Sequence, residues 1–287
     1  MDVKIIEQPI FPPRDRNSHK GTYGTAVLIC GSYGMAGAAV LAAKAALRSG
    51  VGIAKVILPD KIYDIVARQI PEAVFVPLKT SDKGTFCRED APIICEHIKN
   101  ADSVLFGCGV GVSDDNLEIL NALIKDVKCP FIIDADGINL LSRNIDIIKQ
   151  AVASVILTPH PGEMARLTGK SIAEIENNRT YFAEIFSKKY GIVTVLKGSQ
   201  TLVATPKAIY KNIIGNPGMA TGGSGDTLAG ILAAFLAREK DIDYAVTSAV
   251  YIHSAAGDMA AQKMSQTAML PSDIIDQLPC LFKKLEG

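Results

Sequence analysis

Apolar runs of strand length alternate with helix-like segments along most of this chain, and this alternation is the feature that most limits its fold. The run 26–30 is followed by Gly31. The Ala-rich segment 36–48 is followed by Gly50, a residue type that commonly ends helices. Apolar strands that alternate with helices predict an α/β fold, in which a central, mostly parallel sheet has helices on both faces.

The same pattern continues through the rest of the chain. Further strands are expected at 53–58, 73–76, 103–106, 131–134, 155–158 and 192–196, with a hairpin formed by 201–204 and 208–210. Further helices are expected at 61–68, 91–100, 115–125, 226–238 and 244–264, and one more is expected to start at Ser171. No Pro- or Ser-rich linker and no internal repeat interrupts the pattern, which predicts one domain over residues 1–287.

Composition narrows the class of protein. Acidic and basic residues balance at 30 each among 287 residues, so no overall charge favours nucleic acid or a membrane surface as a partner. Charged residues within 1–8 break any signal-peptide pattern, and the longest apolar runs are only of strand length. The six cysteines form no CxxC pair and have no histidine cluster beside them. We therefore expect a soluble cytoplasmic enzyme with reduced thiols rather than a disulfide or zinc protein.

The loop 215–230 carries the strongest indication of chemistry. Its sequence is Gly-Asn-Pro-Gly-Met-Ala-Thr-Gly-Gly-Ser-Gly-Asp-Thr-Leu-Ala-Gly, and it leads directly into an apolar helix. Glycines let a ligand approach the backbone, and the free N–H groups of a helix start bind anions. Asp226 is interpreted either as a helix N-cap or as a base beside a bound phosphate. The availability of Ser224 and Thr227 as caps favours the base, although the helix end is expected to lower its pKa.

The loop 31–39 lies between the first predicted strand and the following helix. Its glycines have GxxGxxG spacing, which differs from both the Rossmann fingerprint and the Walker A loop. A ribose contact by Asp60, after the next strand, is therefore a minor alternative, and a plain tight turn is another. The small residues 36–39 suggest a helix start that is kept clear for a bulky ligand.

Two shorter segments also follow predicted strands, where parallel sheets bind ligands. In 160–163, Pro161 suits a first helical position and Glu163 suits the first turn, while His160 is interpreted as a substrate contact rather than a core residue. In 197–201, a lysine and two hydroxyl residues suit a nucleotide phosphate or ribose, although an ordinary hairpin turn explains them too. His253 lies within an apolar helix and is expected to be packed.

Six segments occur in an order that resembles the ADP-dependent NAD(P)H-hydrate dehydratases. They are 18–24, 31–39, 107–109, 157–163, 196–198 and 219–230, and the resemblance extends over about residues 10–285. It implies a ribokinase-like fold. It also implies a repair activity in which ADP phosphorylates the added hydroxyl of the S epimer of hydrated NADH or NADPH. Elimination of phosphate then restores NAD(P)H and leaves AMP and phosphate.

The resemblance also assigns roles to individual residues. Asp226 would deprotonate the ring hydroxyl, and the N–H groups of Gly223, Ser224 and Gly225 would form the anion hole. The hydrated dinucleotide would contact Ala39, Gly109, His160 and Asp226. The adenine nucleotide would contact Lys197, Gly198, Ser199, Gln200, Thr201 and Gly225. Mg²⁺ is expected to neutralise the phosphates, with Asn139 and Glu163 as outer-sphere partners and its direct ligands unassigned.

The family also suggests a homotetramer. We further expect a separate NAD(P)H-hydrate epimerase, because the chain begins too close to its first strand to include an epimerase domain. Two other functions remain open. A small-molecule kinase of the same fold, acting for example on a vitamin-precursor alcohol, would share the loop 222–226. A nucleotide-binding sensor without catalysis would not depend on Asp226.

Overall fold

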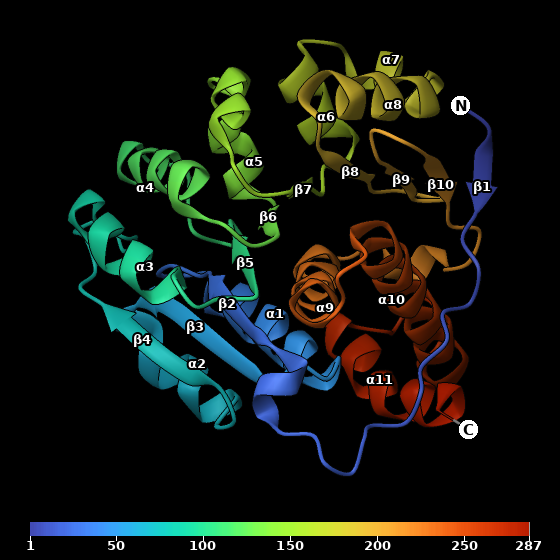
Figure 1. The fold of residues 1–287 in the computed structure, drawn as a ribbon, viewed down its shortest axis with the longest axis horizontal. Helices are drawn as coiled ribbons and strands as arrows, with labels where there is room; N and C mark the ends of the chain where they lie inside the picture. The colour runs from blue at the N-terminus through green and yellow to red at the C-terminus, as the bar shows by residue number, and fades with distance from the viewer. Residues whose placement is uncertain (287) are drawn as a thin grey trace.

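A computed structural model describes residues 1–286, and its strands form one ten-stranded sheet in the order β1-β10-β9-β8-β7-β6-β5-β2-β3-β4 (Figure 1). The pairings are parallel except those of β9, which runs antiparallel to both β8 and β10. The prediction of a mostly parallel sheet with a hairpin near residue 205 is therefore confirmed.

The strands are β1 (Val3–Ile5), β2 (Thr25–Ile29), β3 (Ile53–Pro59), β4 (Val74–Leu78), β5 (Ser103–Phe106), β6 (Phe131–Ile133), β7 (Val155–Leu157), β8 (Val193–Leu196), β9 (Leu202–Ala204) and β10 (Ile209–Lys211). The α-helices are α1 (Ala36–Arg48), α2 (Tyr63–Gln69), α3 (Ala91–Ile98), α4 (Asp114–Asp126), α5 (Asp136–Leu141), α6 (Pro161–Thr168), α7 (Ile172–Asn177), α8 (Arg179–Tyr190), α9 (Ser224–Arg238), α10 (Ile242–Met264) and α11 (Pro271–Leu285). Short 3-10 helices are η1 (Lys20–Tyr23), η2 (Asp60–Ile62), η3 (Arg88–Asp90), η4 (Ile145–Gln150) and η5 (Pro217–Met219).

The sheet separates two hydrophobic cores. Successive residues of a strand point to opposite faces. In β2, Ala26 and Leu28 join one core, while Val27 and Ile29 join the other. Helices α1, α2, α9, α10 and α11 contribute to the first core, and α3 to α8 contribute to the second. Both faces of the central strands are thus covered, which explains why they appear in the sequence as continuous apolar runs.

Helices α1 and α9 lie against each other on the first face, and a glycine makes their close approach possible. A methyl group on Gly230 of α9 would lie 2.1 Å from the carbonyl oxygen of Ala42 in α1. This contact holds the N-terminal end of α9 close to the carboxyl end of the sheet. The Ala-rich composition of α1 therefore serves the position of α9 as well as the formation of the helix itself.

The chain reverses its direction of progress along the sheet at β2. Strands β3 and β4 follow on one side of β2, and β5 to β8 follow on the other, so the order switches between β2 and β5 (Figure 1). The loops after these two strands meet there. Gly31 N–H donates to the Cys108 carbonyl at 2.8 Å, and the Ser32 hydroxyl donates to the Gly109 carbonyl at 2.8 Å. Open α/β sheets bind ligands at such a switch point.

Within residues 1–286, no helix is both long and apolar enough to pass through a membrane.

Candidate active site

The N-terminus of α9 lacks the side-chain cap that usually closes a helix start. Gly223 is the N-cap residue, and no side chain accepts a hydrogen bond from the first turn. Among the described residues, the N–H groups of Gly223, Gly225 and Asp226 donate no hydrogen bond, whereas Ser224 N–H already donates to the Thr221 carbonyl at 3.3 Å. The predicted anion site therefore has free donors on Gly223 and Gly225 but not on Ser224.

Asp226 is the third residue of α9 and does not cap the helix, so its interpretation as an N-cap is wrong. Ser224 and Thr227, the other expected caps, do not cap it either. The Thr227 hydroxyl donates to the Gly223 carbonyl at 3.2 Å instead of accepting from a free N–H. The start of α9 is consequently left open to an incoming anion.

Packing explains why residue 223 is a glycine. Its φ of 95° lies in the left-handed region that glycine adopts without strain. A methyl group there would lie 2.5 Å from Leu41 Cδ1 and 3.2 Å from Pro271 Cγ. A methyl group on Gly222, by contrast, would meet nothing within 4 Å. Gly223 is thus required by the fold, while Gly222 leaves open space at the site.

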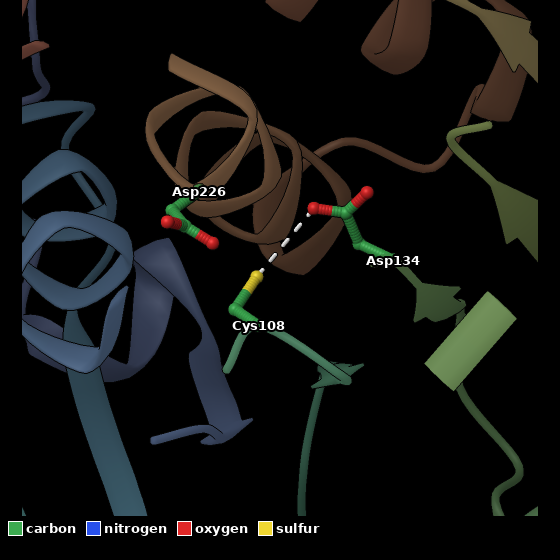
Figure 2. Close-up of side chains that lie close together, drawn as sticks. All are labelled: Cys108, Asp134 and Asp226. Atoms are coloured by element: carbon green, nitrogen blue, oxygen red, sulfur yellow. Dashed lines mark hydrogen bonds between the residues drawn. The ribbon is translucent and has the colours of Figure 1, made fainter. Parts of the chain in front are cut away.

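Asp226 faces two other polar groups near the ends of β5 and β6 (Figure 2). The ligand atoms of Cys108, Asp134 and Asp226 all lie within 4.8 Å of one another, and Cys108 Sγ donates to Asp134 Oδ2 at 3.6 Å. Burial and then the nearby charge of Asp134 raise the pKa of Asp226 to about 6. The expectation that the helix end lowers this pKa is wrong, because desolvation outweighs the favourable helix end.

Asp134 and Lys197 form a buried ion pair that the sequence did not indicate. Lys197 Nζ donates to Asp134 Oδ1 at 2.8 Å, and the Thr158 hydroxyl donates to the same oxygen at 2.6 Å. The Asp134 side chain is only 2% exposed and that of Lys197 only 19%. Burial alone would raise the pKa of Asp134, but the attraction of Lys197 lowers it overall. The two carboxyl groups of the site therefore have pKa values shifted in opposite directions.

Lys197 also lies beside the open end of α9. A methyl group on Gly225 would be 3.4 Å from Lys197 Nζ and 3.9 Å from Asp134 Oδ2. Burial works against the charge of Lys197, but Asp134 and Glu163 raise its pKa well above its usual range, so it stays a cation. A permanent positive charge thus lies close to the free N–H groups of the helix start, which suits the binding of a phosphate group.

His160 caps helix α6 instead of packing in the core. Its Nδ1 accepts from Gly162 N–H at 3.0 Å and from Glu163 N–H at 3.3 Å, while Glu163 Oε2 accepts from His160 N–H at 2.8 Å. Pro161 is the first helical residue, as predicted. Burial lowers the pKa of His160 and raises that of Glu163 to about 7. The exposed His160 ring remains available for the predicted substrate contact.

The other predicted substrate residues occupy the switch point. Gly109 has a φ of 65°, and a methyl group on it would lie 2.9 Å from Ala38 Cβ and 3.0 Å from Met35 Cβ. Gly109 therefore brings the loop after β5 against the start of α1. Ala39 is 0% exposed and belongs to the first core. The Ala39 side chain thus lies beneath the surface of the loop, and the neighbouring residues form the exposed surface there.

The predicted nucleotide segment 197–201 forms the turn between β8 and β9. The Arg179 guanidinium donates to the carbonyls of Leu196 and Lys197 at 3.1 and 3.2 Å and also to that of Ser199. Thr201 Oγ1 donates to the Gly198 carbonyl at 3.1 Å. The side chains of Ser199 and Gln200 are exposed, and Gln200 lines a hollow of about 460 Å³ with residues 176–181. The Lys197 side chain, however, faces Asp134 and lies away from this exposed surface.

The remaining sequence candidates lie outside this constellation or support it indirectly. Asp60 accepts hydrogen bonds from the N–H and the hydroxyl of Thr80, which leaves the alternative ribose contact without support. His253 is buried, as expected, but its Nε2 lies 3.4 Å from Ser224 Oγ. It therefore supports the glycine loop from behind.

Comparisons with known proteins establish the family of this chain. The family model described as NAD(P)H-hydrate dehydratase matches residues 26–280. The chain belongs to the NAD(P)H-hydrate dehydratase family. An ADP-dependent (S)-NAD(P)H-hydrate dehydratase of Bacillus subtilis is 34% identical over 277 residues, which cover 96% of this chain and 95% of the relative.

Solved structures agree with the family assignment. The crystal structure of the ADP/ATP-dependent NAD(P)H-hydrate dehydratase of B. subtilis, co-crystallised with ATP and Mg²⁺, has a TM-score of 0.86 and 31% identity, with full coverage of both chains. A ribokinase-like superfamily protein of Enterococcus faecalis has a TM-score of 0.82 and 31% identity, over 97% of this chain and 93% of the other. The predicted ribokinase-like fold is thereby confirmed. The chain spans about half the length of the bifunctional NAD(P)H-hydrate repair enzymes that it also matches.

The cluster of Cys108, Asp134 and Asp226 has the spacing of a metal site, but its chemistry does not suit a resident Mg²⁺. Asp134 is already paired with Lys197, and the neighbouring Cys30 and then burial raise the pKa of the Cys108 thiol, which therefore stays protonated. Mg²⁺ prefers oxygen ligands and is usually held by one or two carboxylates together with substrate phosphates. Asn139 Oδ1 accepts from Arg166 Nε at 2.9 Å, so this expected outer-sphere partner is also engaged.

Proposed function

We propose that this chain dehydrates the S epimer of hydrated NADH and NADPH, with ADP as phosphoryl donor, and releases NAD(P)H, AMP and phosphate. The observation that carries the proposal is the position of Asp226. Its half-buried carboxylate lies at an uncapped helix start, beside free N–H groups and the Lys197 cation. This combination places a proton acceptor next to a phosphate site, which is what transfer of a phosphoryl group to a hydroxyl requires.

In the first step Asp226 takes the proton of the ring hydroxyl while the hydroxyl oxygen attacks the terminal phosphorus of ADP. The bond from that phosphorus to the bridging oxygen breaks, and AMP leaves. Negative charge accumulates on the transferred phosphoryl group, where the N–H groups of Gly223 and Gly225 and the Lys197 ammonium stabilise it. A pKa of about 6 makes Asp226 a better proton acceptor than an ordinary aspartate while it remains mostly ionised at neutral pH.

In the second step phosphate leaves the ring. The carbon–oxygen bond breaks, the neighbouring ring carbon gives up a proton to the departing phosphate, and the electron pair of that carbon–hydrogen bond forms the restored double bond. Phosphorylation is useful because hydroxide is a poor leaving group and phosphate is a good one. The anion site that stabilised phosphoryl transfer also receives the departing phosphate.

The remaining assignments belong to the same proposal. Gly109 and His160, with the loop that covers Ala39, bind the dinucleotide, while the turn 197–201 and Gly225 bind ADP. Mg²⁺ enters with the nucleotide phosphates as part of the co-substrate. Residues 1–287 form one domain. The chain acts in the cytoplasm as a homotetramer, and a separate epimerase supplies the S epimer.

The test is to follow the near-ultraviolet absorbance of reduced nicotinamide after mixing the protein with hydrated NADH, Mg²⁺ and ADP, and then with ATP. We expect absorbance to rise only when a nucleotide is present, with phosphate and AMP formed in equal amounts when ADP is used. Folded protein that gives no rise with either nucleotide would exclude the repair activity. A stable phosphorylated product without recovery of NADH would favour the alternative vitamin-precursor kinase instead.

A further inference from the structure

A cavity lies at the end of α9 opposite to Asp226. It has a volume of about 520 Å³ and is lined by the N-terminal arm (residues 10–15), the end of α1 with Gly50, the end of α9, Tyr244, and part of α11. In Figure 1 the blue N-terminal arm passes the end of α11 before it reaches β2. A cavity of this size accommodates a small molecule, and none of the residues assigned to the reaction contributes to it.

Two guanidinium groups meet inside this cavity. A methyl group on Gly50 would lie 2.8 Å from Arg14 Nη2 and 3.2 Å from Arg238 Nη1. Arg14 donates to the Gly50 carbonyl at 2.5 Å and stacks on the Tyr23 ring at 3.8 Å. The C-terminal carbonyls of α1 attract cations, which accounts for this arginine.

Arg238 has no such explanation. Within residues 1–286 its side chain forms no hydrogen bond and no ion pair, although its guanidinium carries five N–H donors. Burial, followed by the charge of Arg14, lowers its pKa. Arg238 is half-buried, and arginines that are largely withdrawn from water normally pair with an anion. The ring of Phe235 lies 4.5 Å from its guanidinium, which offsets part of the cost of burial but satisfies none of its donors.

A hydroxyl group in the same cavity also lacks a partner. Ser49, the residue after α1, is 0% exposed, and its Oγ makes no hydrogen bond among the described residues. Aromatic rings lie beside the polar groups: Phe11 contacts Phe235 and Phe282 edge to face at 5.5 and 5.3 Å, and the Arg238 guanidinium lies 5.3 Å from the centre of the Phe11 ring. The lining of the cavity therefore combines cationic donors, a hydroxyl and aromatic surface.

The acidic residues of the cavity form no ion pair with the arginines in the described part of the chain, although the charges of Glu239 and Glu286 act to raise the pKa of Arg238. Asp15 Oδ1 accepts from Asn17 N–H at 2.8 Å, and Glu239 Oε1 accepts from Asp241 N–H at 3.1 Å. Glu286 is exposed, and in the described part of the chain none of the three comes within ion-pair distance of Arg14 or Arg238. A ligand with two negative charges would supply what the protein does not.

We propose that this cavity binds a phosphate monoester that carries an aromatic group. The phosphate accepts hydrogen bonds from Arg14, Arg238 and the Ser49 hydroxyl, because guanidinium forks match phosphate oxygens in pairs. The aromatic group packs on Phe11 and Phe282. This site is separate from the phosphate site at the start of α9, since the two lie at opposite ends of that helix.

Calorimetric titration of the full chain with phenyl phosphate tests the proposal, with inorganic phosphate and benzyl alcohol as the two partial probes. We expect phenyl phosphate to bind more tightly than either probe, and Arg238→Met to weaken it by at least about tenfold. Arg14→Gln should weaken it similarly, and Ser49→Ala less. Arg68→Met, which removes an exposed cation elsewhere, is the matched control and should bind like the wild type.

Three outcomes would overturn the proposal. The first is the absence of measurable binding, and the second is equal binding by Arg238→Met and the wild type. The third is binding that is lost in Lys197→Met but kept in Arg238→Met, because this result would place the phosphate at the start of α9. Circular dichroism establishes that each variant is folded. If Arg238→Met does not fold, Arg14→Gln and Ser49→Ala decide the question on the same criteria.

Discussion

Helices α9 and α11 begin beside each other, and the third residue of each is an aspartate, yet the two aspartates have different roles. Asp273 of α11 accepts the Leu270 N–H at 2.7 Å and so closes the start of its helix. Asp226 of α9 leaves its helix start open and faces Cys108 and Asp134 instead. The comparison teaches that an acid at a helix start indicates function only when the backbone donors around it remain free.

Exchanging the carboxylate for an amide at each position should separate the two roles most clearly. Asp226→Asn is expected to lower the rate of NADH recovery by about 10³-fold, because a general base contributes on this scale. The same change should stabilise the fold at neutral pH. Folding raises the pKa of Asp226 from 3.8 to about 6, so stability is lost as the pH rises between these two values, and the loss is complete at neutral pH.

Denaturant unfolding at neutral pH should show a gain on the order of 1–3 kcal/mol for Asp226→Asn. Asp273→Asn is the matched control, for which we expect unchanged activity and a loss of about 0.5–1 kcal/mol. Equal loss of activity in both variants would mean that the two aspartates do not differ in role.

Removing the cation beside α9 should have the next largest effect. Lys197→Met leaves Asp134 buried without its partner, and we expect a loss of about 3–5 kcal/mol in the free energy of unfolding. The variant that also carries Asp134→Asn should recover much of this stability, because no unpaired charge then remains. It should not recover activity, since the phosphate site still lacks its cation. Recovery of activity in the double variant would show that Lys197 serves only to neutralise Asp134.

The two adjacent glycines of the loop allow a finer comparison. Gly223→Ala introduces a methyl group 2.5 Å from Leu41 Cδ1 at a φ of 95°, so we expect a loss of about 1–3 kcal/mol together with lower activity. Gly222→Ala meets open space and should leave stability within about 0.5 kcal/mol of the wild type. Thermal unfolding of both variants is the measurement. Similar losses in both would contradict the packing described for this loop.

Much of the fold could be predicted because its strands are buried on both faces. Their apolar runs and terminal glycines placed most strands within one or two residues, and α1 was predicted at its observed bounds. Strand β1 was missed because its three residues are exposed and pair with β10, about two hundred residues away. Helix α11 was missed as well, since Pro279 lies inside it and obscures the helical pattern.

The site was predictable only where local pattern carries the information. The glycine-rich sequence of the loop 215–230 predicted both the anion site at the helix start and the role of Asp226 beside it. Asp134 was missed, because an aspartate after a strand is common and its importance depends on Lys197, which lies 63 residues further along the chain. The direction of the pKa shift of Asp226 was wrong for the same reason, since the burial and the second carboxylate that decide it appear only in three dimensions.

The central claim is that Asp226 acts as a half-buried base at an open helix start, and the pH dependence of kcat/KM for NADH recovery tests it most directly. Asp226 must be ionised to accept a proton, so activity should rise with pH through a midpoint near 6. Glu163→Gln should keep this midpoint, which distinguishes it from the titration of Glu163 near 7. A midpoint near 6 in both proteins is the predicted result. A midpoint near 4, or one that disappears in Glu163→Gln, would contradict the account.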